Sequence, residues 1–396
     1  MRAIKPEQLE QLYTTLESRR LFTLGLPTFA SRTGSPLTLL TPEGVSMLVS
    51  QGIRVIVEAG LGKDINYDDA RYSRMGAEIG TRTEALMANV VLYDGTIDVD
   101  DAKIIKPHTL LLVLTRNRPQ NVSAARILLE KQVTVLALDM VQDHRGRCPL
   151  ADILEEVSGR AAISIASAFM ANPRRGKGIL LGGVAGVNPC EVVILGTGMA
   201  ALAAARSAIG LGGMVRLFDS DPYCLRTAIS ELGPAVIGSS LHPTVLGHAF
   251  AAADVIIATR LRHRFAIDDS VYDTMKKGVL IFDLDDVNGF SETFRTLTCM
   301  DTVRAIQQPE IVPSSSVCFT NPISCVPRTA SMALTNDIVP IISRIYGGGH
   351  GLMNVLKTDA GLRNSVVFFR GRIVSREMAA KLNARYVDIN LILSFS

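Results

Sequence analysis

The most informative absences in this 396-residue chain concern net charge and long apolar runs. Its 41 basic and 38 acidic side chains leave a formal net charge of +3, which argues against a nucleic-acid or anionic-membrane partner. No apolar run reaches the roughly eighteen residues of a membrane span, so we expect no membrane segment. The first twenty residues are charged and lack the apolar core of a signal peptide. We therefore expect a cytoplasmic protein.

Closely spaced cysteine pairs are also absent. The six cysteines include no C-x-x-C pair, so the sequence predicts neither a zinc site nor a disulfide framework, and we interpret all six as reduced thiols. Asp283, Asp285 and Asp286 lie close together in the sequence but lack further ligands at metal-binding spacing, and no metal is predicted.

Apolar residues are plentiful. They make up 47% of the chain, which is enough for large buried cores.

A glycine-rich turn follows the apolar run 192–195, which is typical of a buried parallel strand. The turn has the pattern G-x-G-x-x-A, with its three marked positions at Gly196, Gly198 and Ala201, and an alanine-rich helix should begin within it. Gly196 can turn tightly, and Gly198 lets the backbone approach a pyrophosphate. The helix N-terminus then offers free N–H groups and a positive dipole end to that anion. Alanine at the third position is tolerated by the motif.

Asp219 completes this pattern at the end of a second apolar run. It lies 23 positions after Gly196, close to the spacing of about 20 residues expected for an acid that holds a ribose 2′-hydroxyl. A carboxylate there repels a 2′-phosphate, so NAD is favoured over NADP. The alternative is a tight turn in an α/β domain that binds no dinucleotide. Because strand, turn, helix, strand and acid are all present, the sequence predicts NAD as the cofactor.

Strands and helices alternate along most of the chain, which favours an α/β protein with two α/β lobes. We predict a Rossmann-type doubly wound parallel sheet inserted in a discontinuous α/β substrate domain. The N-terminal part of the substrate domain should span 1–148. The NAD-binding domain, with a long leading helix that bridges the lobes, should span 149–320, and C-terminal helices should return to the substrate domain over 321–396. We also predict a helix at 5–20.

Several stretches together carry a family resemblance. They include LTPEGVSMLVSQGIRVIVEAGLG (40–62), GILLGGVAGVNPCEVVILGTG (178–198) and NPISCVPRTASMALTN (321–336). On these residues the chain resembles the alanine dehydrogenase family, which is related to the nucleotide-binding soluble part of the proton-translocating transhydrogenase. The resemblance implies an NAD-dependent oxidoreductase that interconverts L-alanine with pyruvate and ammonia. It also implies a small amino acid or 2-oxo acid as substrate and a homo-oligomer as the assembly.

The resemblance further implies an Arg and a Lys that hold the substrate, and a His that acts as acid and base. These residues are replaced here. The Arg position holds Leu37, with Arg32 nearby but out of register. The Lys position falls at Tyr93-Asp94, and the His position falls at Thr115, which Arg116 follows. A 2-oxo acid's carboxylate needs a bidentate Arg, and Thr cannot titrate near neutrality.

An Asp beside the nicotinamide is implied as well. It falls on Asp286 if one residue is deleted and on Val287 without a gap, and Asp286 is our predicted catalytic acid.

The cofactor side matches the family better. Besides the glycines and Asp219, Ser240 lies where the family contacts adenosine, although a helix cap or turn is an equal alternative for it. Asn321 matches the residue beside the nicotinamide. The family's Ser in the bridging helix is replaced by Glu155. The basic run 260–264 could meet phosphates, but a solvated loop is favoured.

Two functions follow from this pattern. The first is an NAD-dependent oxidoreductase resembling alanine dehydrogenase, with an altered substrate and with Arg116 or Arg32 as replacement anion anchors. The second is a catalytically silent relative that binds NAD(H) as a structural or regulatory partner. Hydride exchange between nucleotides is less favoured, because the membrane segments and the mobile loop of that family are absent.

Overall fold

The computed structural model describes residues 22–28, 37–116, 120–173, 176–261, 269–284, 290, 294–297, 316–347 and 351–394. The chain forms two compact units, which we call unit 1 (Met1–Ala151 with Pro327–Ser396) and unit 2 (Asp152–Val326). The helix predicted at 5–20 lies outside the described residues. So do Arg32, Asp286 and Val287.

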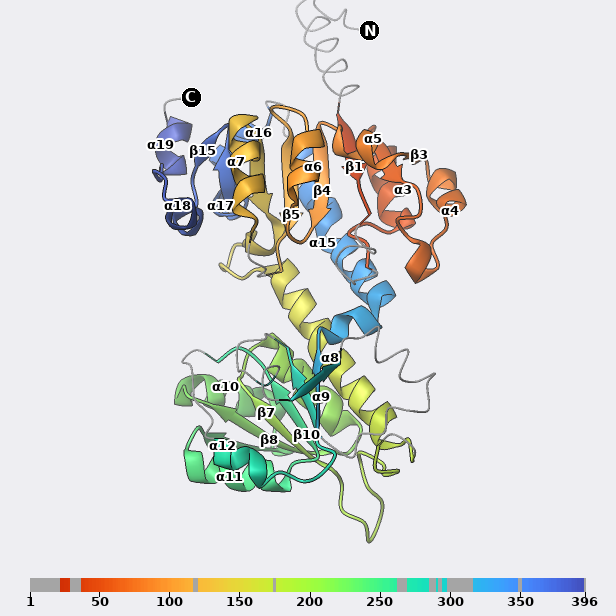
Figure 1. Cartoon of the computed structure of the whole chain (residues 1–396), viewed down its shortest axis with the longest axis vertical. Helices are drawn as coiled ribbons and strands as arrows, with labels where there is room; N and C mark the ends of the chain where they lie inside the picture. Colours follow the sequence, from red (N-terminus) through yellow and green to blue (C-terminus); the bar gives the residue numbers. More distant parts are fainter. Residues whose placement is uncertain are drawn as a thin grey trace, which may run out of the picture. The chain divides into compact units, whose positions relative to one another are not determined.

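Unit 2 contains a seven-stranded, all-parallel sheet in the order β12-β13-β11-β10-β7-β8-β9. The chain runs outward from β7 through β8 to β9 and then returns to β10 on the other side, which is the doubly wound arrangement that the sequence predicts. Figure 1 shows β7, β8 and β10 side by side. The strands are β7 (Glu191–Leu195), β8 (Met214–Asp219), β9 (Val236–Ser240), β10 (Val255–Ala258), β11 (Leu280–Asp283), β12 (Arg295–Leu297) and β13 (Val317–Thr320).

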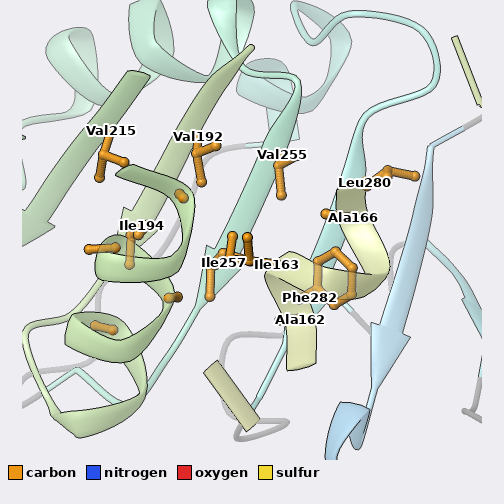
Figure 2. Close-up of a cluster of buried hydrophobic side chains, with 14 of the residues drawn as sticks. Ala162, Ile163, Ala166, Val192, Ile194, Val215, Val255, Ile257, Leu280 and Phe282 are labelled. Atoms are coloured by element: carbon orange, nitrogen blue, oxygen red, sulfur yellow. The ribbon is translucent and has the colours of Figure 1, made fainter. Parts of the chain in front are cut away.

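Helices cover both faces of this sheet, so its central strands are buried throughout. The helices after the glycine-rich turn are α9 (Met199–Gly210), α10 (Pro222–Leu232), α11 (Pro243–Ala252) and α12 (Asp269–Asp273). The long helix α8 (Pro149–Met170) packs on one face (Figure 2). There Ala162, Ile163 and Ala166 meet Ile257 and Phe282 in one fully buried cluster.

Unit 1 contains an eight-stranded mixed sheet in the order β15-β14-β6-β5-β4-β1-β2-β3. Its first six strands in chain order are parallel, and β14 and β15 pair antiparallel at one edge. The strands are β1 (Thr23–Leu26), β2 (Arg54–Glu58), β3 (Glu78–Gly80), β4 (Val90–Asp94), β5 (Leu110–Leu114), β6 (Thr134–Ala137), β14 (Val366–Phe369) and β15 (Arg372–Ile373). The predicted α/β class with two sheets, one of them inserted in a discontinuous unit, is confirmed.

Side-chain caps mark the start of several helices of unit 1. Thr41 caps α3, because its hydroxyl accepts a hydrogen bond from the backbone N–H of Gly44, and Pro42 occupies the first turn. The α-helices of unit 1 and the short 3₁₀ helices of the chain (η) are α3 (Pro42–Ser50), η1 (Lys63–Ile65), α4 (Asp69–Arg74), α5 (Arg82–Leu86), α6 (Val99–Ile104), α7 (Val122–Glu130), η2 (Leu138–Met140), η3 (Pro322–Cys325), α15 (Pro327–Gly347), α16 (Leu352–Thr358), α17 (Ala360–Asn364), α18 (Arg376–Leu382) and α19 (Ile389–Ser394).

Two predictions need correction. The C-terminal segment is not helical throughout, because β14 and β15 form a hairpin that adds to β6. The two residues between these strands, Arg370 and Gly371, both have positive φ (46° and 81°), the geometry of the tight type I′ turn that joins antiparallel strands. Cys325 is disulfide-bonded, so the prediction that all six cysteines are thiols is wrong.

Candidate functional site

The glycine-rich turn of unit 2 depends on the absence of a side chain at its first position. Gly196 has a φ of +99°, which L side chains rarely adopt, and a Cβ there would lie 2.2 Å from Oγ1 of Thr259. The Gly196 N–H donates to the carbonyl of Phe218 at 2.7 Å. This hydrogen bond holds the turn against the carboxyl end of β8, where the predicted ribose-binding acid follows.

The N-terminus of α9 is open. Gly198 is its N-cap residue, is exposed, and provides no side-chain cap, since it has no side chain. The first N–H groups of this twelve-residue helix are therefore available to an anion. Ala201, the third marked position, is fully buried in the cluster that packs α9 on the sheet. That placement explains why a small residue is needed there.

Asp219 lies beside this turn and is held in place by two donors. Oγ1 of Thr197 donates to its Oδ2 at 2.6 Å, and the backbone N–H of Asp221 donates to its Oδ1 at 2.9 Å. The carboxylate is only 4% exposed and therefore depends on these hydrogen bonds. The structure thus brings Gly196, Gly198 and Asp219 together, as the sequence predicts.

Ser240 and Asn321 lie at carboxyl ends of other strands in the same sheet. Ser240 ends β9, is exposed, and is the register partner of Asp219. Asn321 follows β13 in a left-handed conformation (φ 53°), and its carbonyl accepts hydrogen bonds from Ser324. Ligands of doubly wound sheets bind at this edge, close to the switch point between β7 and β10. These residues fit a dinucleotide: a cradle that a Cβ would fill, an open helix N-terminus and a fixed carboxylate.

Glu155 of α8, the residue that replaces the cofactor-contacting Ser implied by the resemblance, lies beside the glycine-rich turn. A Cβ on Gly198 would lie 3.7 Å from its Oε2, so the carboxylate stands beside the open N-terminus of α9. One turn further along α8, a Cβ on Gly159 would lie 2.2 Å from the carbonyl oxygen of Ala200. A glycine four residues after Glu155 is the signal that could have revealed it, because such a glycine allows a close approach of two helices.

At the carboxyl edge of the sheet in unit 1, the charged residues at positions 94 and 116, where we expect replaced substrate groups, pair with each other. Nη2 of Arg116 lies 2.6 Å from Oδ2 of Asp94, and the two side chains are 9% and 2% exposed. Arg116 adopts a left-handed backbone conformation (φ 51°) that accompanies this contact. Thr115 donates from its Oγ1 to Asp139 at 2.6 Å, and the backbone N–H of Arg116 donates to the same carboxylate at 2.9 Å.

Leu37 and Tyr93, at two further positions where we expect replaced substrate groups, belong to the core of unit 1. Leu37 is buried, and the next residue, Thr38, donates its N–H to the hydroxyl of Ser331 on α15. Tyr93 donates its hydroxyl to Asp101 at 2.6 Å. Hence Leu37 is part of the apolar core and the Tyr93 hydroxyl is engaged with Asp101, and neither side chain supplies a cationic group.

Comparisons with known proteins place these features in a family. The profile described as "Alanine dehydrogenase/PNT, C-terminal domain" matches residues 162–376, and its N-terminal counterpart matches 38–160. The alanine dehydrogenase of Bacillus subtilis (strain 168) is 30% identical over 355 residues, which cover 88% of this chain and 92% of that protein.

Solved structures show the same similarity. An L-alanine dehydrogenase structure gives a TM-score of 0.76 at 25% identity, covering 90% of this chain and 98% of that one. A transhydrogenase structure from Sinorhizobium meliloti gives a TM-score of 0.69 at 18% identity, covering 90% and 99%, and therefore shares the fold. No helix in the described part of the chain has the length and apolarity that crossing a membrane would require.

Proposed function

Because the chain belongs to the alanine dehydrogenase/PNT family, we propose that it is an NAD-dependent oxidoreductase that acts on a small amino acid or 2-oxo acid. We assign cofactor binding to unit 2 and substrate binding chiefly to unit 1. The observation that carries the proposal is the carboxylate of Asp219, held by Thr197 beside the Gly196 turn. NAD would supply the hydride acceptor for oxidation of the amino acid.

The residues of unit 2 would divide the work of binding. The N–H groups at the start of α9 would hold the pyrophosphate, and Gly198 would allow its close approach. Asp219 would accept hydrogen bonds from the ribose hydroxyls and repel a 2′-phosphate, which favours NAD over NADP. Ser240 would contact the adenosine and Asn321 the nicotinamide side. Asp286, outside the described residues, remains the proposed catalytic acid.

The substrate is proposed to differ from alanine and pyruvate. At the positions where the family holds its substrate, this chain has a buried leucine, a tyrosine bonded to Asp101, and an arginine paired with Asp94. The Asp94 carboxylate neutralises much of the charge that Arg116 could offer to a substrate carboxylate. Ordinary alanine dehydrogenase activity is therefore expected to be weak.

A second candidate function rests on the ion pair between Arg116 and Asp94. Because Arg116 is engaged with Asp94 and Thr115 with Asp139, the edge of unit 1 resembles a stabilised structural core more than a clamp for a substrate. The protein would then bind NAD(H) as a structural or regulatory ligand without turnover. A homo-oligomer is proposed in either case, and light scattering would measure its mass.

A titration followed by an assay separates these functions. NADH is added to the protein and its fluorescence followed. NADH oxidation is then measured with ammonia and, in turn, pyruvate and larger 2-oxo acids. If the protein is an oxidoreductase with an altered substrate, we expect NADH binding and turnover with a 2-oxo acid other than pyruvate. Binding without any turnover supports the silent relative, fast turnover with pyruvate contradicts the altered substrate, and no binding at millimolar NADH contradicts both.

A further inference from the structure

Glu155 places a negative charge where the proposed cofactor would place its own. Its Oε2 would lie 3.7 Å from a Cβ on Gly198, the residue at which the helix α9 begins. A pyrophosphate bound at the start of α9 would have to approach the same open N–H groups. The two anions would therefore compete for one short stretch of backbone.

The packing of α8 on α9 explains why the carboxylate lies there. Gly159 approaches the first turn of α9 so closely that a Cβ would lie 2.2 Å from the Ala200 carbonyl oxygen and 3.0 Å from the Ala204 nitrogen. Glu155 precedes Gly159 by four residues, so the two share one face of α8 and lie one turn apart. The close contact at Gly159 thus fixes the backbone that carries Glu155.

The carboxylate also has a favourable role in the protein without cofactor. The positive end of the α9 dipole stabilises a negative charge near its first turn, and Gly198 supplies no side-chain cap of its own. Glu155 is therefore well placed to satisfy the electrostatics of this helix start while no phosphate is there.

We propose that Glu155 acts as a built-in competitor of the cofactor's pyrophosphate, which stabilises the empty site and lowers the affinity for NAD(H). This inference rests on the proposed NAD(H)-binding function. At separations of about 5 Å near a protein surface, a repulsion between unit charges corresponds to a change of tenfold or more in a dissociation constant. Neutralising residue 155 should therefore tighten binding rather than weaken it.

The test compares four proteins by NADH fluorescence titration: the wild type, Glu155→Gln, Glu155→Ser and Glu156→Gln. Glu156 is the matched control, since it is the next residue on the same helix and pairs with Arg160 on its exposed side. We expect both changes at Glu155 to tighten NADH binding by about tenfold or more, and Glu156→Gln to change it less than twofold. In the absence of nucleotide, Glu155→Gln should lower the melting temperature by about 1–3 °C, because a stabilising anion at a helix N-terminus is lost.

Two competitors separate the charge effect from a change in shape. ADP-ribose contains the pyrophosphate, whereas adenosine contains none. The gain in affinity at Glu155→Gln should appear with ADP-ribose and be absent with adenosine. An equal gain with adenosine, or an equal gain in the Glu156→Gln control, would overturn the competition.

The remaining outcomes distinguish this inference from the proposed function. If the wild type binds NADH and Glu155→Gln binds it equally or more weakly, the inference is wrong while the function stands. If only the Glu155 variants bind NADH, the competition is supported, but NAD(H) binding as the function of the wild type is contradicted. If neither the wild type nor any variant binds millimolar NADH, the proposed function fails and the inference fails with it.

Discussion

The two sheets of this protein share a strand order but differ at their first crossover. In unit 1 the parallel strands follow the order β3-β2-β1-β4-β5-β6, and in unit 2 the matching order is β9-β8-β7-β10-β11-β13, with β12 added outside β13. Both therefore have a switch point next to their first strand, where a doubly wound sheet can bind a ligand. Topology alone does not say which of the two does so.

The start of the first crossover helix makes the difference. In unit 2, α9 begins at the exposed Gly198, three residues after the end of β7. In unit 1, α3 begins at the buried Thr41, whose hydroxyl already accepts from Gly44. One helix N-terminus is open to an outside anion, and the other is capped by its own chain. Hence the local sequence, and not the fold, decides which unit is suited to a phosphate.

The charged residues at the carboxyl edges of the two sheets show the same contrast between a self-satisfied edge and an open one. Unit 1 pairs Asp94 with Arg116 inside the protein, so this edge is neutralised from within. Unit 2 leaves Asp219 fixed by neutral donors, a hydroxyl and a backbone N–H, so the carboxylate keeps its charge for a ligand.

The largest effect is expected from breaking the buried pair of unit 1. Arg116→Met leaves Asp94 buried beside an apolar side chain and should lower the free energy of unfolding by about 3–5 kcal/mol. The double variant with Asp94→Asn should recover part of that loss. Urea denaturation measures both. The exposed pair Arg54–Glu78 is the control, and Arg54→Met should change stability by less than about 1 kcal/mol. A small loss at Arg116, equal to the control, would contradict internal neutralisation.

The second largest effect is expected when a side chain is introduced into the glycine-rich turn. Gly196→Ala forces a side chain into a positive-φ conformation and against Thr259, and should lower stability by about 2–3 kcal/mol and abolish NADH binding. Gly210→Ala, at the other end of α9, meets no atom within 4 Å and should be neutral or slightly stabilising. Thermal unfolding and NADH titration of the two variants test this. Normal NADH binding by Gly196→Ala would contradict the role of the turn.

Much of the fold could be predicted from the sequence, because its signals are local. The apolar run of β7 and the glycine-rich turn each depend on a few neighbouring residues, and the structure confirms both. The β14–β15 hairpin could not be predicted from such signals. Its strands are short and gain their partners only from β6, more than two hundred residues earlier in the chain.

The candidate site divides in the same way. Gly196, Gly198 and Asp219 are separated by a fixed strand and helix, so their spacing predicts their proximity. The resemblance implies that residue 155 lies on the cofactor side, but its contact with the start of α9 arises only from the packing of α8 on α9, and the Asp94–Arg116 pair accompanies a left-handed turn at Arg116. No spacing rule covers either contact, because both depend on tertiary packing.

A moderate, pH-dependent effect on stability is expected at Asp254, which lies at the amino edge of the unit 2 sheet, just before β10. Burial would raise the pKa of Asp254, but hydrogen bonds from Lys177 and the Glu191 N–H outweigh it and hold the pKa below its usual value of 3.8. The resulting stabilisation of the folded state is complete above pH 3.8. It is lost as the pH falls through the lowered pKa that Asp254 has in the folded protein. Lys177→Met should lower stability by about 1–2 kcal/mol at pH 7 and flatten its decline below pH 4.

Chemical denaturation at pH 7, 4 and 3 measures this effect. An unchanged pH profile in the Lys177 variant would show that the ion pair does not hold Asp254 ionised. It would leave the contrast between the two carboxyl edges untouched.

The smallest effect is expected at Thr197. Thr197→Val removes the hydroxyl that fixes Asp219 and should weaken NADH binding about threefold to tenfold. Thr197→Ser keeps a hydroxyl at this position and should bind NADH as the wild type does. The preference for NADH over NADPH should fall in the Val variant, because the carboxylate is less firmly placed. Tighter NADH binding by the Val variant would mean that Thr197 competes with the ribose instead of positioning the acid.

An NADH titration of the wild type and of Asp219→Asn tests most directly whether unit 2 binds a dinucleotide. If unit 2 is the dinucleotide site, the wild type should bind NADH saturably, and Asp219→Asn should bind it about tenfold or more weakly, with a reduced preference for NADH over NADPH. Absence of binding by the wild type, or equal binding by the two proteins, would contradict the assignment of unit 2 as the dinucleotide site.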